Sequence, residues 1–225
     1  MRSHAKLARV TAILRTAYRP QRPSRPWGNP LDALVQTILS QNTSDQNSRR
    51  AYEALRARFP SWEAVHRAPL RALIAGIRCG GLANIKAVRI KALLEEIWRD
   101  QGHFDLSFLR DLPSEEVAAY LGRFRGIGSK TVACVLLFGL GRPAFPVDTH
   151  VHRVTRRLGL LDGATSPERA QALLEPQIPP ADRYALHVGL IEHGRRVCRA
   201  QRPLCPDCPL GRLCEHRARA PRASC

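Results

Sequence analysis

Lysine is scarce in this strongly basic chain. Only Lys6, Lys86, Lys91 and Lys130 are lysines, and arginine supplies the remaining 32 of the 36 basic residues. Both side chains bind anions, but a guanidinium stays protonated, whereas an amine can lose its proton and form an imine. Imine chemistry by a lysine side chain is therefore confined to four positions.

Aromatic residues, acidic residues and long apolar runs are also in short supply. Aromatic residues make up 6% of the chain, which argues against a platform on which single-stranded bases stack. No apolar run is long enough to span a bilayer, so we expect no membrane partner. No segment alternates apolar and polar residues over a strand length, which excludes a half-buried sheet.

The charge balance indicates a polyanionic partner. The 36 basic residues face only 19 acidic ones, for a net charge of +17. Nucleic acid and an anionic membrane surface both suit such a field. The basic residues are spread over the whole chain rather than along one amphipathic stretch, which favours nucleic acid.

Cysteine usage predicts a bound cluster. Four of the seven cysteines, Cys198, Cys205, Cys208 and Cys214, are separated by six, two and five residues. This spacing differs from the paired knuckles of structural zinc sites, whereas four thiolates in one short loop suit a 4Fe-4S cluster. An odd cysteine count with four ligands argues against a disulfide scaffold and for a reducing intracellular compartment, the cytoplasm and nucleoid if the source is bacterial.

Apolar residues at helical spacing predict an all-α fold. We expect helices at the N-terminus, over 31–39 and around 90–97, and over 45–59, 114–121, 130–140, 149–158, 167–174 and 181–194. The proline-rich stretch 19–30 reads as a linker, and 217–222 as a disordered basic tail.

A glycine-flanked turn lies between two of these helices. Gly126-Ile127-Gly128 follows one helix and directly precedes the next, and no acidic residue occurs from Leu121 to Val132. Glycines bring backbone N–H groups close to a phosphate, and the new helix adds the positive end of its dipole. An ordinary turn is the alternative, but Arg123, Arg125 and Lys130 favour phosphate binding by a helix-hairpin-helix.

Lys130 is expected in the first turn of the second hairpin helix, where the dipole disfavours a cation. Such surroundings favour the neutral amine, which is the nucleophile for Schiff-base chemistry on a sugar carbon. A solvated surface lysine is the alternative interpretation.

Asp148 follows 18 residues later in Val147-Asp148-Thr149-His150-Val151. It is suited to cap the helix that begins there. A capped carboxylate stays ionised, so it could also stabilise an oxocarbenium-like sugar or deprotonate a nucleophile.

Taken together, the chain resembles the endonuclease III family of helix-hairpin-helix glycosylases. The Gly-hydrophobic-Gly-x-Lys-Thr hairpin, the Val-Asp-Thr-His-Val segment and the cysteine loop occur in the family's order. The resemblance implies a six-helix barrel domain over 29–143. It also implies a cluster domain built from 1–28 and 144–225, with Lys130 as nucleophile, Asp148 as its partner and a largely structural 4Fe-4S cluster.

The same resemblance assigns contacts to DNA. Asn42, where the family commonly has glutamine, or the neighbouring Gln41 would fill the gap left by a flipped base, and Leu82 would be a second wedge. Arg125 and Ser129 depart from the usual hairpin proline and basic residue. The residues expected to contact DNA are Gln41, Asn42, Leu82, Arg125, Gly126, Ile127, Gly128, Ser129 and Thr131.

The leading hypothesis is a monomeric, bifunctional enzyme that flips a damaged pyrimidine out of duplex DNA, displaces it with Lys130 and cleaves the strand by β-elimination. A monofunctional adenine or mismatch glycosylase and a non-catalytic DNA-binding protein are the alternatives.

Overall fold

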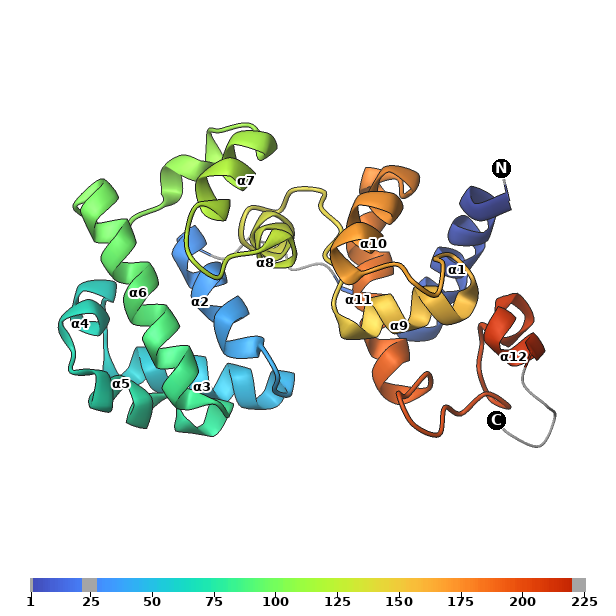
Figure 1. Ribbon diagram of the computed structural model, residues 1–225, viewed down its shortest axis with the longest axis horizontal. Helices are drawn as coiled ribbons and strands as arrows, with labels where there is room; N and C mark the ends of the chain where they lie inside the picture. Colours follow the sequence, from blue (N-terminus) through green and yellow to red (C-terminus); the bar gives the residue numbers. More distant parts are fainter. Residues whose placement is uncertain (1, 22–27, 220–225) are drawn as a thin grey trace. The chain divides into compact units, whose positions relative to one another are not determined.

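The fold is all-helical, as expected. The computed structural model describes residues 2–21 and 28–219, and every regular element among them is a helix (Figure 1). Among these helices, none combines the length and apolar character needed to cross a bilayer. Residues 22–27 of the predicted linker lie outside the described residues, as do Cys225 and the end of the basic tail.

The chain divides into two compact units. One comprises Arg25–Arg142 and the other Met1–Ser24 with Pro143–Cys225. The first unit contains α2 to α8, three short helical turns included. Its elements are α2 Pro30–Ser40, α3 Asp45–Arg58, α4 Trp62–Arg67, α5 Leu70–Gly76, η1 Arg78–Gly80, α6 Ala83–Gln101, η2 Ser107–Arg110, α7 Ser114–Gly122, α8 Ser129–Cys134 and the π-helical η3 Val135–Gly139.

The core of the first unit forms around α2 and α6, whose apolar stripes were visible in the sequence. Leu34 and Leu39 of α2 and Ile90 and Leu94 of α6 are fully buried. The π-helical turn packs closely on α2, since a Cβ on Gly139 would lie 2.7 Å from the Cβ of Ala33. Helices α4 and α5 were not singled out from the sequence, because six or seven residues hold too few turns to show a periodicity.

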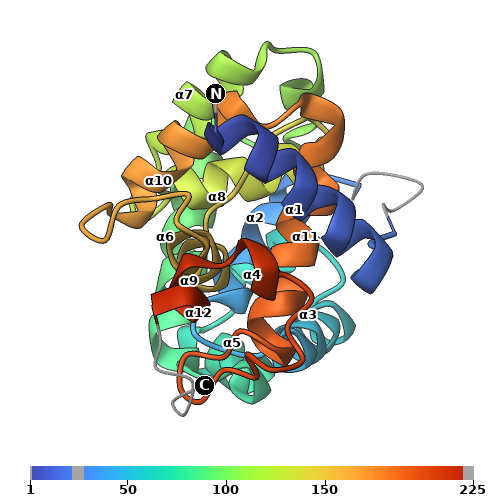
Figure 2. The same ribbon diagram turned by 90° about the vertical axis from the view of Figure 1, so that its right-hand side faces the viewer.

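The second unit joins the two ends of the chain. Its elements are α1 Arg2–Tyr18, α9 Thr149–Leu158, α10 Pro167–Leu174, η4 Glu175–Gln177, α11 Pro180–Arg196, η5 Gly211–Leu213 and α12 Glu215–Arg219. Leu7, Val10 and Leu14 of α1 are buried in one cluster with residues of α9 and α11. A Cβ on Gly189 of α11 would lie 2.9 Å from the Cβ of Leu14, so α1 and α11 cross at close range, as Figure 2 shows.

The expectation of disorder from Arg217 onward is wrong for 217–219, because those residues form the end of α12.

Candidate active site

The hairpin of the first unit has the geometry that its glycines predict. Gly126 has a φ of +84°, a left-handed conformation that favours glycine, and Gly128 is extended with a φ of −96° and a ψ of 177°. Helix α8 starts at the next residue, and the first backbone N–H bonded within it is that of Thr131, 2.9 Å from the Gly128 carbonyl. The N–H groups of Ser129 and Lys130 therefore have no intrahelical partner.

The side chains of the hairpin differ in accessibility. Arg125 and Ser129 are exposed and have no hydrogen-bond partner among the described residues. Ile127 and Thr131 are buried, at 8% and 4% exposure, and their backbone N–H groups already donate to the carbonyls of Phe124 and Gly128. The hairpin can thus offer backbone N–H groups, one arginine and one hydroxyl to a phosphate.

Arg123 is held within the protein. Its guanidinium pairs with Asp100 and lies 4.1 Å from the ring centroid of Tyr120. Hydrogen bonds from Gln101 and from Arg123 hold the pKa of the Asp100 carboxyl below its usual value. The sequence led us to expect that Arg123 helps to bind phosphate, but its side chain is already engaged in an ion pair.

Lys130 differs from the other three lysines. Lys6 donates to the carbonyl of Leu158, and Lys91 donates to those of His66 and Ala68. Lys86 donates to those of Leu39 and Gly80. Each of these three ammonium groups thus binds a carbonyl at or near the end of a helix. Lys130 is half-buried, and its amine has no hydrogen-bond or ion-pair partner among the described residues.

Asp148 of the second unit caps α9, as the sequence predicts. Its Oδ1 accepts a hydrogen bond from the backbone N–H of Val151 at 2.7 Å. The carboxylate is half-buried. The cap fixes the side chain at the N-terminus of α9, beside the positive end of the helix dipole.

The expected wedge residues occupy two loop tips of the first unit. Asn42 follows α2 with a φ of 51° and is exposed, and Leu82 precedes α6 with a φ of 50° and is 50% exposed. Gln41, the alternative to Asn42, is bound through its side-chain carbonyl by Arg89 at 2.6 Å. Asn42 and Leu82 are therefore exposed at these tips, and the Asn42 side chain has no hydrogen-bond partner among the described residues.

The four cysteines of the cassette line one cavity of the second unit. The sulfur of Cys198 accepts a bond from Arg157 at 3.3 Å, and the guanidinium of Arg157 also binds the carbonyls of Arg199 and Ala200. The imidazole of His193 lies 3.6 Å from the sulfur of Cys208. Burial lowers the pKa of His193 to about 4, so this ring is neutral near pH 7.

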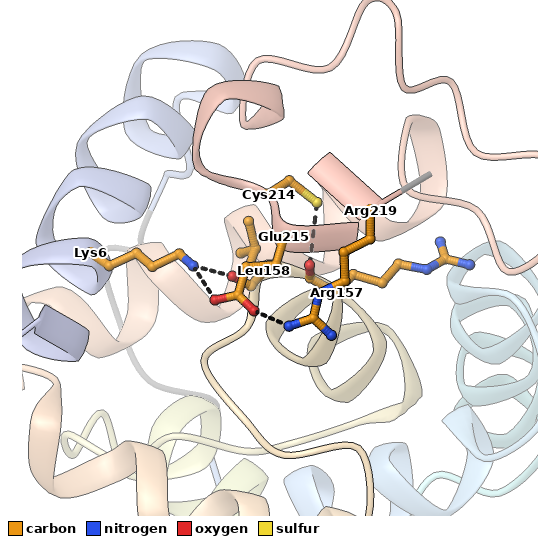
Figure 3. A network of polar contacts seen from close by, with 6 residues as sticks. All are labelled: Lys6, Arg157, Leu158, Cys214, Glu215 and Arg219. Atoms are coloured by element: carbon orange, nitrogen blue, oxygen red, sulfur yellow. Dashed lines mark hydrogen bonds and ion pairs between the residues drawn. The ribbon is translucent and has the colours of Figure 1, made fainter. Parts of the chain in front are cut away.

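The end of the cysteine loop is fastened to α1 and α9 (Figure 3). Glu215, which follows Cys214, pairs with Lys6 of α1 and with Arg219 of α12, both at 3.2 Å. The thiol of Cys214 donates to the carbonyl of Arg157 at 3.3 Å. The sequence did not indicate that Arg157 and Lys6 bind the cysteine loop, because both lie on helices far from it in the chain. His193 is nearer, 15 residues before Cys208, but no spacing pattern singled it out.

Comparison with known proteins identifies the family. A family model described as HhH-GPD superfamily base excision DNA repair protein matches residues 35–180. The chain belongs to this superfamily. Endonuclease III of Thermotoga maritima is 33% identical over 191 residues, covering 83% of each chain. Endonuclease III of Sulfolobus acidocaldarius is 30% identical over 190 residues, covering 84% of this chain and 82% of its own.

Solved structures of the HhH-GPD superfamily share the fold. A non-covalent endonuclease III–DNA complex superposes with a TM-score of 0.81 at 27% identity, over 96% of each chain. A trapped covalent endonuclease III–DNA intermediate gives the same TM-score and identity. The all-α architecture expected from the sequence is confirmed by these neighbours.

Other relatives are longer than this HhH-GPD chain. An Arabidopsis thaliana protein whose name places it among DNA glycosylases is 42% identical over 168 residues, and the match spans 57% of its length. The match to Transcriptional activator DEMETER of the same plant is 33% identical and covers 89% of this chain but 10% of that protein.

Proposed function

We propose that this HhH-GPD protein is a DNA glycosylase and abasic-site lyase that removes damaged pyrimidines from duplex DNA. The observation that carries the proposal is the state of Lys130. Three lysines use a compact ammonium to bind backbone carbonyls, which explains why arginine does not replace them there. Lys130 has no such partner among the described residues, so its being a lysine is best explained by amine chemistry.

The proposed reaction uses the amine twice. The Lys130 nitrogen attacks C1′ of the flipped nucleotide, the bond from C1′ to the base breaks, and the base leaves with a proton. Opening of the sugar ring gives an imine between C1′ and the lysine. Loss of a proton from C2′ then expels the 3′ phosphate, and water releases the amine. Asp148, as a fixed ionised carboxylate, would stabilise the positive charge that develops on the sugar.

We also propose that Cys198, Cys205, Cys208 and Cys214 hold a 4Fe-4S cluster. The donor set is entirely thiol, and all four residues line the same cavity. A single zinc ion would need the four sulfurs about 2.3 Å from one point. Within the described residues no such convergent group occurs. Bound there, the cluster would tie the loop to α9 and α11.

Borohydride trapping tests the proposed function. On a duplex containing an abasic site, the unmutated protein should give a covalent complex and a cleaved strand. Lys130→Ala and Lys130→Arg should give neither, because neither side chain forms an imine. Lys91→Met, which removes a different lysine of the same unit, should retain trapping.

Three results would contradict the proposal. Trapping by Lys130→Arg would make another amine the nucleophile. Base release without any trapping by the unmutated protein would favour a monofunctional glycosylase, and specific binding with neither activity would favour a DNA-binding protein.

A further inference from the structure

Lys86 is a buried cation that the proposed reaction does not use. Its side chain is 1% exposed, which is unusual for lysine because burial of an ammonium costs several kcal/mol unless hydrogen bonds compensate. Burial lowers its pKa. The ammonium donates to the carbonyl of Leu39 at 2.7 Å and to that of Gly80 at 2.8 Å. The burial of this ammonium group therefore needs an explanation.

The two carbonyls belong to the segments that precede the loops carrying Asn42 and Leu82, here called the wedge loops. Leu39 lies in the last turn of α2, three residues before Asn42. Gly80 ends η1, two residues before Leu82. One ammonium therefore bonds directly to the backbone beside both tips, although these carbonyls are 41 residues apart in the chain.

Both tips have left-handed backbone conformations, with φ values of 51° at Asn42 and 50° at Leu82. Asparagine adopts this conformation comparatively readily, whereas it costs leucine about 1–2 kcal/mol. The conformation at Leu82 must therefore be imposed by its surroundings. The segment at Gly80 is further fixed by α3, because a Cβ there would lie 2.9 Å from the Cβ of Ala51.

A second contact from the same helix reaches the same loop. Arg89, three residues after Lys86 on α6, donates to the side-chain carbonyl of Gln41 at 2.6 Å. Helix α6 thus holds both the backbone before Asn42 and the side chain beside it. The negative end of the α2 dipole favours a cation at Leu39, and a compact ammonium can reach both carbonyls from a buried position.

We propose that Lys86 is a positioning residue that couples the two wedge loops, so that Asn42 and Leu82 are presented to the duplex as one rigid pair. This inference rests on the proposed function and on the expectation, drawn from the sequence, that the two tips enter DNA. Lys86 itself does not touch DNA. Without it, each tip can move independently, and the extruded base loses the support that holds the helix open.

Lys86→Met tests the coupling, with Lys91→Met as the matched control. Lys91 lies on the same helix and also donates to two backbone carbonyls, but these are at the end of α4, away from the wedge loops. Loss of alignment of about 1 Å can cost about 100-fold in rate. We expect Lys86→Met to lower kcat/KM for excision of an oxidised pyrimidine by about 10- to 100-fold, and Lys91→Met to leave it near the unmutated value.

A fluorescence measurement reports the wedges directly. With 2-aminopurine opposite a tetrahydrofuran abasic-site analogue, the unmutated protein and Lys91→Met should change the emission on binding. Lys86→Met should bind the duplex but change the emission much less. Equal excision and equal emission for the two variants would overturn the coupling. Failure of the proposed function is recognised separately, as absence of trapping by the unmutated protein.

A double-mutant cycle covers the case in which Lys86→Met does not fold. Asn42→Ala and Leu82→Ala, singly and together, are compared in the chain that retains Lys86. Coupled tips should give a combined loss of kcat/KM that departs from the product of the single losses by more than about threefold. A simple product would show independent loops and overturn the inference.

Discussion

At the scale of single residues, hydrogen bonds separate structural cations from available ones. Arg123 and Arg125 stand two positions apart in the hairpin, yet Asp100 pairs with the first and the second has no partner among the described residues. The same distinction separates Lys86 and Lys91 from Lys130. Charge by itself does not identify the residues that face a ligand.

Asp148 caps α9 in the structure, and we propose that its charge also stabilises the reacting sugar. Substitutions can separate these two roles. Asp148→Ala should lose the cap of α9 and about 1 kcal/mol of unfolding free energy, whereas Asp148→Asn should keep the cap. Both should reduce base excision by orders of magnitude, because both remove the charge. Thermal unfolding and single-turnover excision measure the two effects.

Ser166→Ala is the control for Asp148, since Ser166 caps α10 of the same unit by accepting from the N–H of Arg169 at 3.3 Å. It should destabilise to a similar degree without affecting excision. Unchanged excision by a folded Asp148→Asn protein would leave Asp148 as a helix cap only.

At the scale of elements, the cysteine loop is a long irregular segment fastened at several points. Arg157 of α9 binds it at Cys198 and Arg199, Lys6 of α1 binds Glu215, and Leu204 bonds back to Val197 at 2.9 Å. Helices from both ends of the chain therefore meet at this loop. Its order is expected to depend on the group that the cysteines hold.

Anaerobically purified protein should contain iron and acid-labile sulfide in nearly equal amounts, and little zinc. Cys205→Ser should lower the iron content and the thermal stability, because Cys205 is a buried member of the cavity. Cys79→Ser should change neither, since Cys79 is exposed and lies outside the loop. Stoichiometric zinc without iron would contradict the cluster.

At the scale of the whole molecule, a net charge of +17 should govern binding to undamaged duplex. The logarithm of the affinity should fall linearly with the logarithm of salt concentration, with a slope of about −0.9 for each phosphate neutralised. Arg125→Ala should make this slope less steep by about 0.9, the value for one phosphate contact. Arg123→Ala should leave the slope nearly unchanged, because Asp100 already pairs with that guanidinium. A flat dependence would show that the basic surface does not bind DNA.

The sequence by itself determined the features that depend on neighbouring residues. Apolar spacing predicted the helices, glycines predicted the hairpin, and the position of Asp148 before α9 predicted its cap. The cysteine spacing predicted a shared site, and the four residues line one cavity. Helix periodicity, caps and tight turns are all encoded within a few residues, so these predictions needed no knowledge of distant contacts.

The tertiary structure decided which of the basic residues are available. Asp100 engages Arg123, Arg89 engages Gln41, and Arg157 reaches the loop at Cys198. The partners in these pairs lie 23, 48 and 41 residues apart, beyond any local pattern. Lys86 is the clearest example of a residue whose role depends on tertiary structure. It lies on an amphipathic helix, and no neighbouring residue in the sequence indicates that its side chain is buried. Only folding brings the ends of α2 and η1 to its ammonium, where burial makes the two carbonyls necessary partners.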